Sequence, residues 1–177
     1  MERFLKSTKG GFTLSNSIVE HWNNTDRKLP YFDVIVYPNG NVTILNFYSC
    51  FNPNSGERLQ FCSPVCDTTI DSIVKYNGDC WTPVDEWIGT RIGYKNRTIF
   101  GGEGAMGSDG FIACVDEEEN LIWAMFFSNT NPIKNIEIVN NTLLATNEHS
   151  DLQLEINLDS LTDIKIKNDE LKRIPIK

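Results

Sequence analysis

The sequence predicts a mainly β fold, in which antiparallel meander sheets are accompanied by one or two short helices. Runs of β-branched and aromatic residues recur along the chain, and Gly, Pro, Asn or Asp bounds them. The connections between these runs are short, whereas parallel neighbours would need crossovers of about a dozen residues or more. In residues 152–158, apolar and polar side chains alternate, which is typical of a strand buried on one face.

The length of 177 residues suits a single β-rich domain over residues 1–177, with residues 168–177 expected to form a mobile tail. The strand pattern resembles one blade of a β-propeller and part of the next. A closed propeller needs at least about four blades of roughly forty residues, so closure is barely possible in this length. An open, strongly twisted sheet or a sandwich is therefore the prediction.

The first part of the chain contains one helix signal and one strong hairpin signal. Apolar residues at helical spacing predict a short helix over residues 14–22. Residues 31–37 and 42–48 are β-rich runs on either side of Asn39-Gly40. Asn-Gly tolerates the positive φ of a primed turn, so these runs are predicted to form a hairpin.

The stretch that follows has weaker signals. Residues 51–64 are expected to form a loop with a few extended residues, and residues 80–83 an irregular segment. Residues 67–76 fit a helix capped by Asp67, although their alternation also fits a strand; the helix is slightly favoured. Residues 87–94 are expected to form a strand.

The fold is expected to be organised around residues 100–127, where a glycine-rich loop leads into two apolar strands. These strands, 111–115 and 121–127, are joined by a turn whose acidic residues 116–119 lie at a solvated tip. Three further runs are expected to continue this hairpin into a five-strand meander: 133–139, 142–146 and 152–158.

The stretch from Gly102 to Gly107 matches G-x-G-x-x-G, a dinucleotide-binding pattern. That chemistry needs the glycines at a strand-to-helix turn, where helix amides hold the pyrophosphate. Here a strand follows instead, and Glu103 would repel phosphate. The glycines are better explained by a hairpin connection or by a close backbone approach to a partner.

The chain is acidic, with 16 Lys and Arg against 24 Asp and Glu, a formal charge of −8 and a pI near 4.7. This charge disfavours direct binding to nucleic acid or to anionic membranes and favours a basic partner. The sequence contains neither the apolar core of a secretory signal nor a run of about eighteen apolar residues. A cytoplasmic protein without membrane contact is therefore expected.

No residue pattern indicates catalysis, a metal or a cofactor. The five cysteines form an odd set, and we expect them to be reduced and to act as small buried hydrophobes. Cys62-x-x-x-Cys66 supplies too few zinc ligands, and His21 and His149 lie in no ligand spacing. The chain is accordingly expected to bind no metal or cofactor and not to be an enzyme.

The residues 102–111, 121–123 and 131–133 combine a glycine-rich loop with propeller-like strands. Over roughly residues 91–165, this pattern resembles small bacterial immunity proteins, which are encoded beside polymorphic or contact-dependent growth-inhibition toxins. The resemblance implies a non-enzymatic cytosolic inhibitor that binds and occludes the catalytic domain of its cognate toxin, often a basic nuclease.

The predicted toxin contacts are acidic residues, which steer and complement basic partners, together with one tryptophan. The simpler interpretation of the acidic residues 116–119 is a solvated turn that binds no partner. A monomer is expected. Two other functions remain open: a β-rich module that binds a small molecule or glycan through Trp81, Trp87 and nearby carboxylates, and a hydrolase with a carboxylate pair. The predicted contacts are Glu103, Asp109, Asp116, Glu117, Glu118, Glu119 and Trp87.

Overall fold

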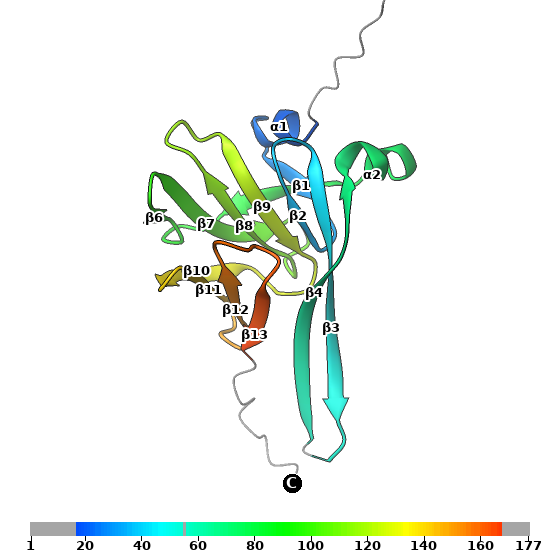
Figure 1. Ribbon diagram of the computed structural model, residues 1–177, viewed down its shortest axis with the longest axis vertical. Coiled ribbons are helices and arrows are strands. Elements are labelled where there is room, and N and C mark those ends of the chain that lie inside the picture. The colour runs from blue at the N-terminus through cyan, green and yellow to red at the C-terminus, as the bar shows by residue number, and fades with distance from the viewer. Residues whose placement is uncertain (1–16, 55, 168–177) are drawn as a thin grey trace, which may run out of the picture.

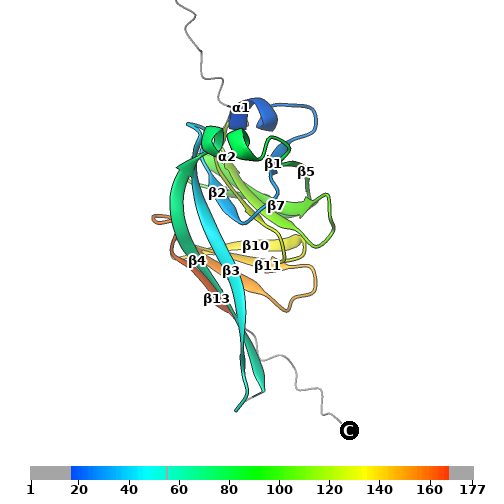
Figure 2. The same ribbon diagram turned by 90° about the vertical axis from the view of Figure 1, so that its right-hand side faces the viewer.

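The structure is a computed structural model that describes residues 17–54 and 56–167. Within these residues, the chain forms two antiparallel sheets that pack against each other, with two short helices beside the larger sheet (Figures 1 and 2). The predicted fold class is confirmed, because the protein is mainly β and its larger sheet is curled and open. The predicted tail, residues 168–177, lies outside the described residues.

The larger sheet has nine strands in the spatial order β1-β5-β7-β8-β9-β2-β3-β4, and β6 pairs with β7 beside this path. All of its strand pairs are antiparallel. Its strands are β1 (Lys28–Pro30), β2 (Val34–Val36), β3 (Asn41–Asn52), β4 (Glu57–Thr69), β5 (Trp81–Glu86), β6 (Ile92–Tyr94), β7 (Arg97–Gly104), β8 (Gly110–Val115) and β9 (Leu121–Phe127).

The smaller sheet is a four-stranded meander of β10 (Ile133–Val139), β11 (Thr142–Asn147), β12 (Gln153–Asn157) and β13 (Ile164–Lys167). β9 pairs with β2 and β8, so the expected five-strand meander is wrong at the step from β9 to β10. Here Asn131 takes a positive φ of 60° and Pro132 follows it. Since proline cannot donate to a strand ladder, the pairing ends and the chain starts a second sheet.

Apolar clusters cover both faces of the larger sheet. Between the two sheets, Ile112 and Cys114 of β8 pack with residues of the smaller sheet. On the opposite face, Phe111 and Ala113 share a cluster with residues of helices α1 (Ser17–Trp22) and α2 (Ile70–Tyr76). Because both faces of β8 are covered, its sequence is a continuous apolar run instead of an alternating one.

Both helices lie within the segments predicted to be helical. The first helix was predicted over residues 14–22, and α1 covers residues 17–22, the part of this range that the structure describes. α2 begins at Ile70 and is capped by Thr69, whose hydroxyl accepts a hydrogen bond from the Ser72 amide at 3.2 Å, so the cap is two residues later than expected. Among the residues that the structure describes, no helix has the length and apolar character needed to cross a membrane.

The β2–β3 hairpin is confirmed, although its turn is of another type. The Gly40 amide donates to the Tyr37 carbonyl, and the Tyr37 amide donates to the Asn41 carbonyl, both at 3.0 Å. Gly40 has a φ of +84°, while Asn39 is not in the positive-φ region. Pro38 supplies the fixed negative φ of an ordinary type I turn, which explains why a three-residue loop forms instead of a primed Asn-Gly turn.

β3 and β4 form a long hairpin whose far end extends beyond the two sheets (Figures 1 and 2). The expected loop over residues 51–64 is therefore wrong. The turn signals Asn52-Pro53-Asn54 mark only the tip, and the chain returns in register from the pair Asn52–Glu57. Residues 80–83 are likewise a strand rather than irregular, because most of this segment lies in β5 and pairs with β1. Of the strand expected over residues 87–94, only Ile92–Tyr94 forms, as β6. Below, the far part of the hairpin, Tyr48–Asn52 with Glu57–Phe61, is called the arm.

The first half of the glycine-rich segment is part of β7 and not a loop. A Cβ atom on Gly102 would lie 2.0 Å from the Asp85 carbonyl oxygen and 2.9 Å from the Trp87 amide nitrogen. Only glycine therefore allows β5 to approach β7 this closely. The close backbone approach that the sequence analysis expected toward a partner is instead made between two strands of this chain, β5 and β7.

Candidate functional site

The candidate site is an acidic groove at one end of the larger sheet, with a volume of about 830 Å³. Three segments form it: the end of α1 with the loop after it, the strand β5, and the turn between β8 and β9. These segments meet because β5 pairs with β1 and β7, and β7 pairs with β8. The groove is lined by Trp22, Asn23, Asn24, Thr25, Asp26, Arg27, Pro83, Val84, Asp85, Glu86, Glu118, Glu119 and Asn120.

Two arginines and two glutamates form a network of ion pairs at the wall of the groove. Arg91 binds Glu86 with nitrogen–oxygen distances of 2.6 and 2.9 Å, and it binds Glu119 with distances of 2.6 and 3.0 Å. Arg27 lies 3.2 Å from Glu119 and 3.7 Å from Glu86. The two-pronged contacts of Arg91 fix both carboxylates in orientation and tie β5 to the β8–β9 turn.

Aromatic rings lie beneath this network. The Arg91 guanidinium is 4.7 Å from the centre of the Phe100 ring, and the Arg27 guanidinium is 5.3 Å from it. Arg27 also lies 5.1 Å from the Trp22 ring. Trp22 and Phe100 are buried, so these cation–π contacts hold the arginines against a rigid apolar floor.

The network shifts the pKa values of Glu119 and Arg91. Hydrogen bonds from Arg91, with further help from Arg27, lower the pKa of Glu119 below its usual value. The same bonds to Glu119 and Glu86 raise the pKa of Arg91 further. All four groups are partly exposed, so solvent screening limits what each ion pair contributes to stability. Their structural effect is to fix the shape of the groove wall.

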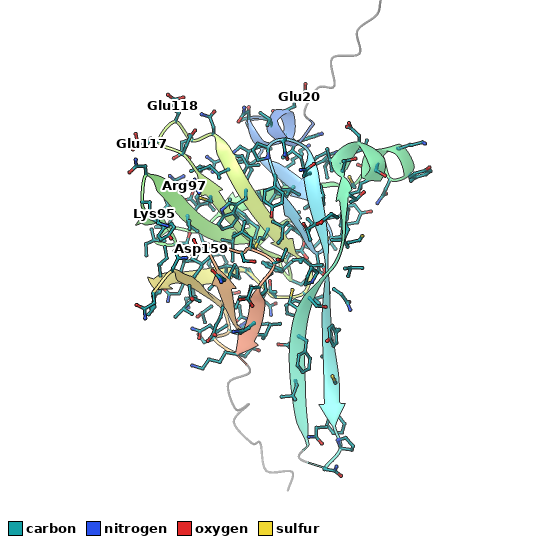
Figure 3. The ribbon with its side chains drawn as sticks, viewed as in Figure 1. Glu20, Lys95, Arg97, Glu117, Glu118 and Asp159 are labelled. Atoms are coloured by element: carbon teal, nitrogen blue, oxygen red, sulfur yellow. The ribbon has the colours of Figure 1, made fainter. Side chains whose placement is uncertain are left out.

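The acidic turn is held in one conformation by its own first residue. The Asp116 carboxylate accepts hydrogen bonds from the amides of Glu118 and Asn120, at 2.9 and 2.8 Å. Glu119 follows with a positive φ of 64°, a strained conformation for a residue with a side chain. In this conformation Glu119 reaches Arg91, while Glu117 and Glu118 point away from the body of the protein (Figure 3).

The predicted contacts are therefore divided among different roles. Asp116 holds the turn and Glu119 belongs to the ion-pair network, whereas Glu117 and Glu118 are exposed. Glu118 alone of the predicted residues lines the groove without an ion pair in the described part of the chain.

Glu103 and Asp109 are not near the acidic turn, although the sequence analysis groups them with it as predicted contacts. They flank the other end of β8, which is six residues long, so about 20 Å separates the two ends. Asp109 is only 5% exposed, and burial raises the pKa of its carboxyl. It is not part of an exposed acidic surface.

Trp87 also has a structural role outside the groove. Its amide donates to the Gly101 carbonyl at 3.0 Å, and its carbonyl accepts from the Thr90 hydroxyl at 2.9 Å. Thr90 is buried, and its hydroxyl also bonds both the carbonyl and the amide of Gly101, at 2.8 and 3.1 Å. This anchor fixes the chain directly before Arg91.

The sequence did not identify the groove residues Asp26, Arg27, Asp85 and Glu86, nor Arg91, which binds Glu86 and Glu119 at the groove wall. They come from segments far apart in the chain, and no spacing in the sequence links them. The sequence contained one indication of the groove, the acidic pair Asp85-Glu86 beside Trp87, but it was interpreted as part of a glycan-binding site.

Other candidate chemistries find less support in the geometry. Within residues 17–54 and 56–167, no three His, Cys, Asp or Glu side chains are grouped to hold a metal ion. His21 stacks on Trp81 with ring centres 3.7 Å apart, so one face of Trp81 is already covered.

The expectation of buried cysteines holds for Cys80 and Cys114 and is wrong for Cys50 and Cys66, which are exposed on the β3–β4 hairpin.

Comparisons of the chain with known protein families, with curated proteins and with solved structures find no match. The geometry and charge of the acidic groove are therefore the basis of the functional proposal.

Proposed function

We propose that this chain is a binding protein that takes a basic protein domain in the acidic groove, as an immunity protein takes its toxin. The observation that supports this most directly is the combination of a preorganised wall with carboxylates that form no ion pair within the described residues. Five carboxylates line the groove, and only Arg27 among the lining residues is basic. The ion-pair network holds Glu86 and Glu119, which leaves Asp26, Asp85 and Glu118 for a partner.

In this proposal, the acidic surface acts in two steps. Glu117 and Glu118 extend at the tip of the turn (Figure 3) and raise the rate of encounter with a positively charged domain. Lys or Arg side chains of the partner then pair with Asp26 and Asp85, which are both exposed. Occlusion of the partner's active surface by the groove rim would inhibit it without any catalysis by this chain, in the cytoplasm where toxin and inhibitor meet.

The alternative of a glycan-binding module is less well supported. Such a module needs an open aromatic face, but His21 covers one face of Trp81 and the groove's own Trp22 is 2% exposed. The groove lining is instead dominated by charged and amide side chains.

The test uses the neighbouring reading frame. If it encodes a large secreted protein with a basic C-terminal domain, that purified domain is titrated with this chain and its toxic activity is measured. The groove variant is Asp26→Lys with Asp85→Lys. The control is Glu148→Lys with Asp159→Lys, which makes the same charge change in two connections of the smaller sheet, β11–β12 and β12–β13. Asp159 is labelled in Figure 3.

Wild-type protein and the control variant should inhibit at equal concentrations, whereas the groove variant should need at least about tenfold more protein. Equal inhibition by all three proteins would remove the groove from the interface. No inhibition by wild-type protein, or a neighbouring operon of metabolic enzymes, would refute the immunity function itself.

A further inference from the structure

The arm is an exposed apolar element far from the acidic groove. It extends away from the two sheets, whereas the groove lies at the opposite end of the larger sheet (Figure 1). Tyr48 and Phe61 lie opposite each other in register, and their rings stack with centres 5.3 Å apart while remaining 43% and 39% exposed. Phe51, on the other face of the ribbon, is 65% exposed.

β4 is also an edge strand with an unprotected outer side. It is last in the strand order, and in the described part of the chain no strand pairs with its outer edge. Proteins usually protect such an edge with charged residues, proline or a bulge. In β4, Pro64 and a bulge protect the half near the body, but residues 59–63 read Leu-Gln-Phe-Cys-Ser, without charge or proline.

A two-stranded ribbon that lies beyond the body is marginally stable alone, because three or more strands are normally needed to bury an apolar face. Pairing with a further strand would satisfy the outer backbone groups of β4 and cover part of its apolar face. The remaining question is which chain supplies that strand.

The distribution of charge favours a second copy of this chain. Of the residues from Asn41 to Thr69, only Glu57, Arg58 and Asp67 are charged, so the net charge of −8 is concentrated on the rest of the molecule. Two copies repel each other wherever their bodies approach. Antiparallel pairing of two arms brings the neutral segments together and sends the acidic bodies to opposite ends of the joined ribbon.

We propose that the protein forms a two-fold symmetric dimer in which the β4 edges of two arms pair antiparallel, giving a four-stranded ribbon. A register centred on Gln60 places Leu59 beside Phe61 of the second copy, and Phe61 beside Leu59 of the second copy. These side chains share the face of Tyr48, so the two stacked aromatic pairs join into one apolar strip. In this proposal the protein is a dimer instead of the expected monomer.

The first test measures molar mass against concentration for the full chain, by analytical ultracentrifugation. Wild-type protein should dimerise. Phe61→Lys places like charges near the two-fold axis and should raise the dissociation constant at least about tenfold. Phe51→Lys, which adds the same charge on the other face of the ribbon, should leave it within about threefold of wild type. Circular dichroism confirms that each variant is folded.

The second test does not depend on the Phe61 variant. In a background with Cys50, Cys62 and Cys66 replaced by Ser, Gln60→Cys should form a disulfide-linked dimer on mild oxidation. Ser63→Cys should not, because in this register its two copies are about 20 Å apart along the strands. A wild-type protein that remains monomeric at all concentrations, a dimer that Phe61→Lys does not weaken, or equal cross-linking of the two cysteine variants would each overturn the proposal.

Discussion

Substitution of Gly102 by alanine should destabilise the protein strongly and specifically. The new Cβ atom would lie 2.0 Å from the Asp85 carbonyl oxygen, whereas real Cβ atoms are found no closer than 3.0 Å, so β5 must move by about 1 Å or more. This movement strains the packing, at about 1–3 kcal/mol. It also weakens backbone pairing between β5 and β7, at about 0.5–1.5 kcal/mol for each hydrogen bond.

Together these costs give a loss of about 2–5 kcal/mol in the free energy of unfolding, a large share of a typical stability of about 5–15 kcal/mol. Urea denaturation followed by tryptophan fluorescence measures this loss. Gly93→Ala is the matched control, because Gly93 also lies in a strand and a Cβ atom there would meet nothing within 4 Å. If both variants lose equal stability, or if neither changes, the close approach of β5 and β7 is refuted.

Three further predictions concern single side chains. The stability difference between wild type and Glu119→Gln should be present at neutral pH, because the folded pKa of Glu119 lies below its unfolded value. The difference should begin to fall near the unfolded pKa of about 4.3 and be lost as the pH drops through the lower folded pKa. Urea titrations at several pH values test this, and a difference that grows toward low pH would contradict it. Thr90→Val should cost about 1–3 kcal/mol in thermal unfolding, because the Gly101 amide loses its hydrogen bond to the buried Thr90 hydroxyl and the Gly101 carbonyl keeps only the bond from the Trp87 amide. A loss below about 0.5 kcal/mol would argue against this anchor. Cys66 is exposed and should react quickly with a thiol reagent, whereas Cys114 should react only on unfolding, because it is buried and its pKa is raised to about 11. Mass spectrometry of the labelled protein distinguishes the two cysteines, and equal labelling would contradict the fold at β8.

Local signals in the sequence were sufficient to predict most strands and both helices. The apolar runs of β8 and β9 and the alternation in β12 reflect burial on two faces and on one face, respectively. Local signals did not predict where strands far apart in sequence would meet. β2 pairs with β9 across about ninety residues, and no property of either strand alone specifies that partner.

The same limit applies to the candidate site. The acidic turn was recognisable because its four carboxylates are consecutive, but the function of each depends on Arg27 and Arg91, which only the fold brings close. The arm was missed for a different reason. Its turn residues are typical of a loop, and its strands lack the alternation that one-sided burial imposes, because both faces of the arm are largely exposed.

The most direct test of the central claim is the rate of association between this chain and the basic domain that the proposal expects the neighbouring reading frame to encode, measured by stopped flow at about 0.01 M and about 0.15 M salt. Screening lengths at these concentrations are about 30 Å and about 8 Å, so steering by the acidic groove should be strong at the first and weak at the second. The wild-type rate should fall about tenfold or more between them, and Asp26→Lys with Asp85→Lys should remove most of this dependence. A wild-type rate that is the same at both salt concentrations, or a groove variant with an unchanged salt dependence, would contradict the proposal that the acidic groove binds a basic partner.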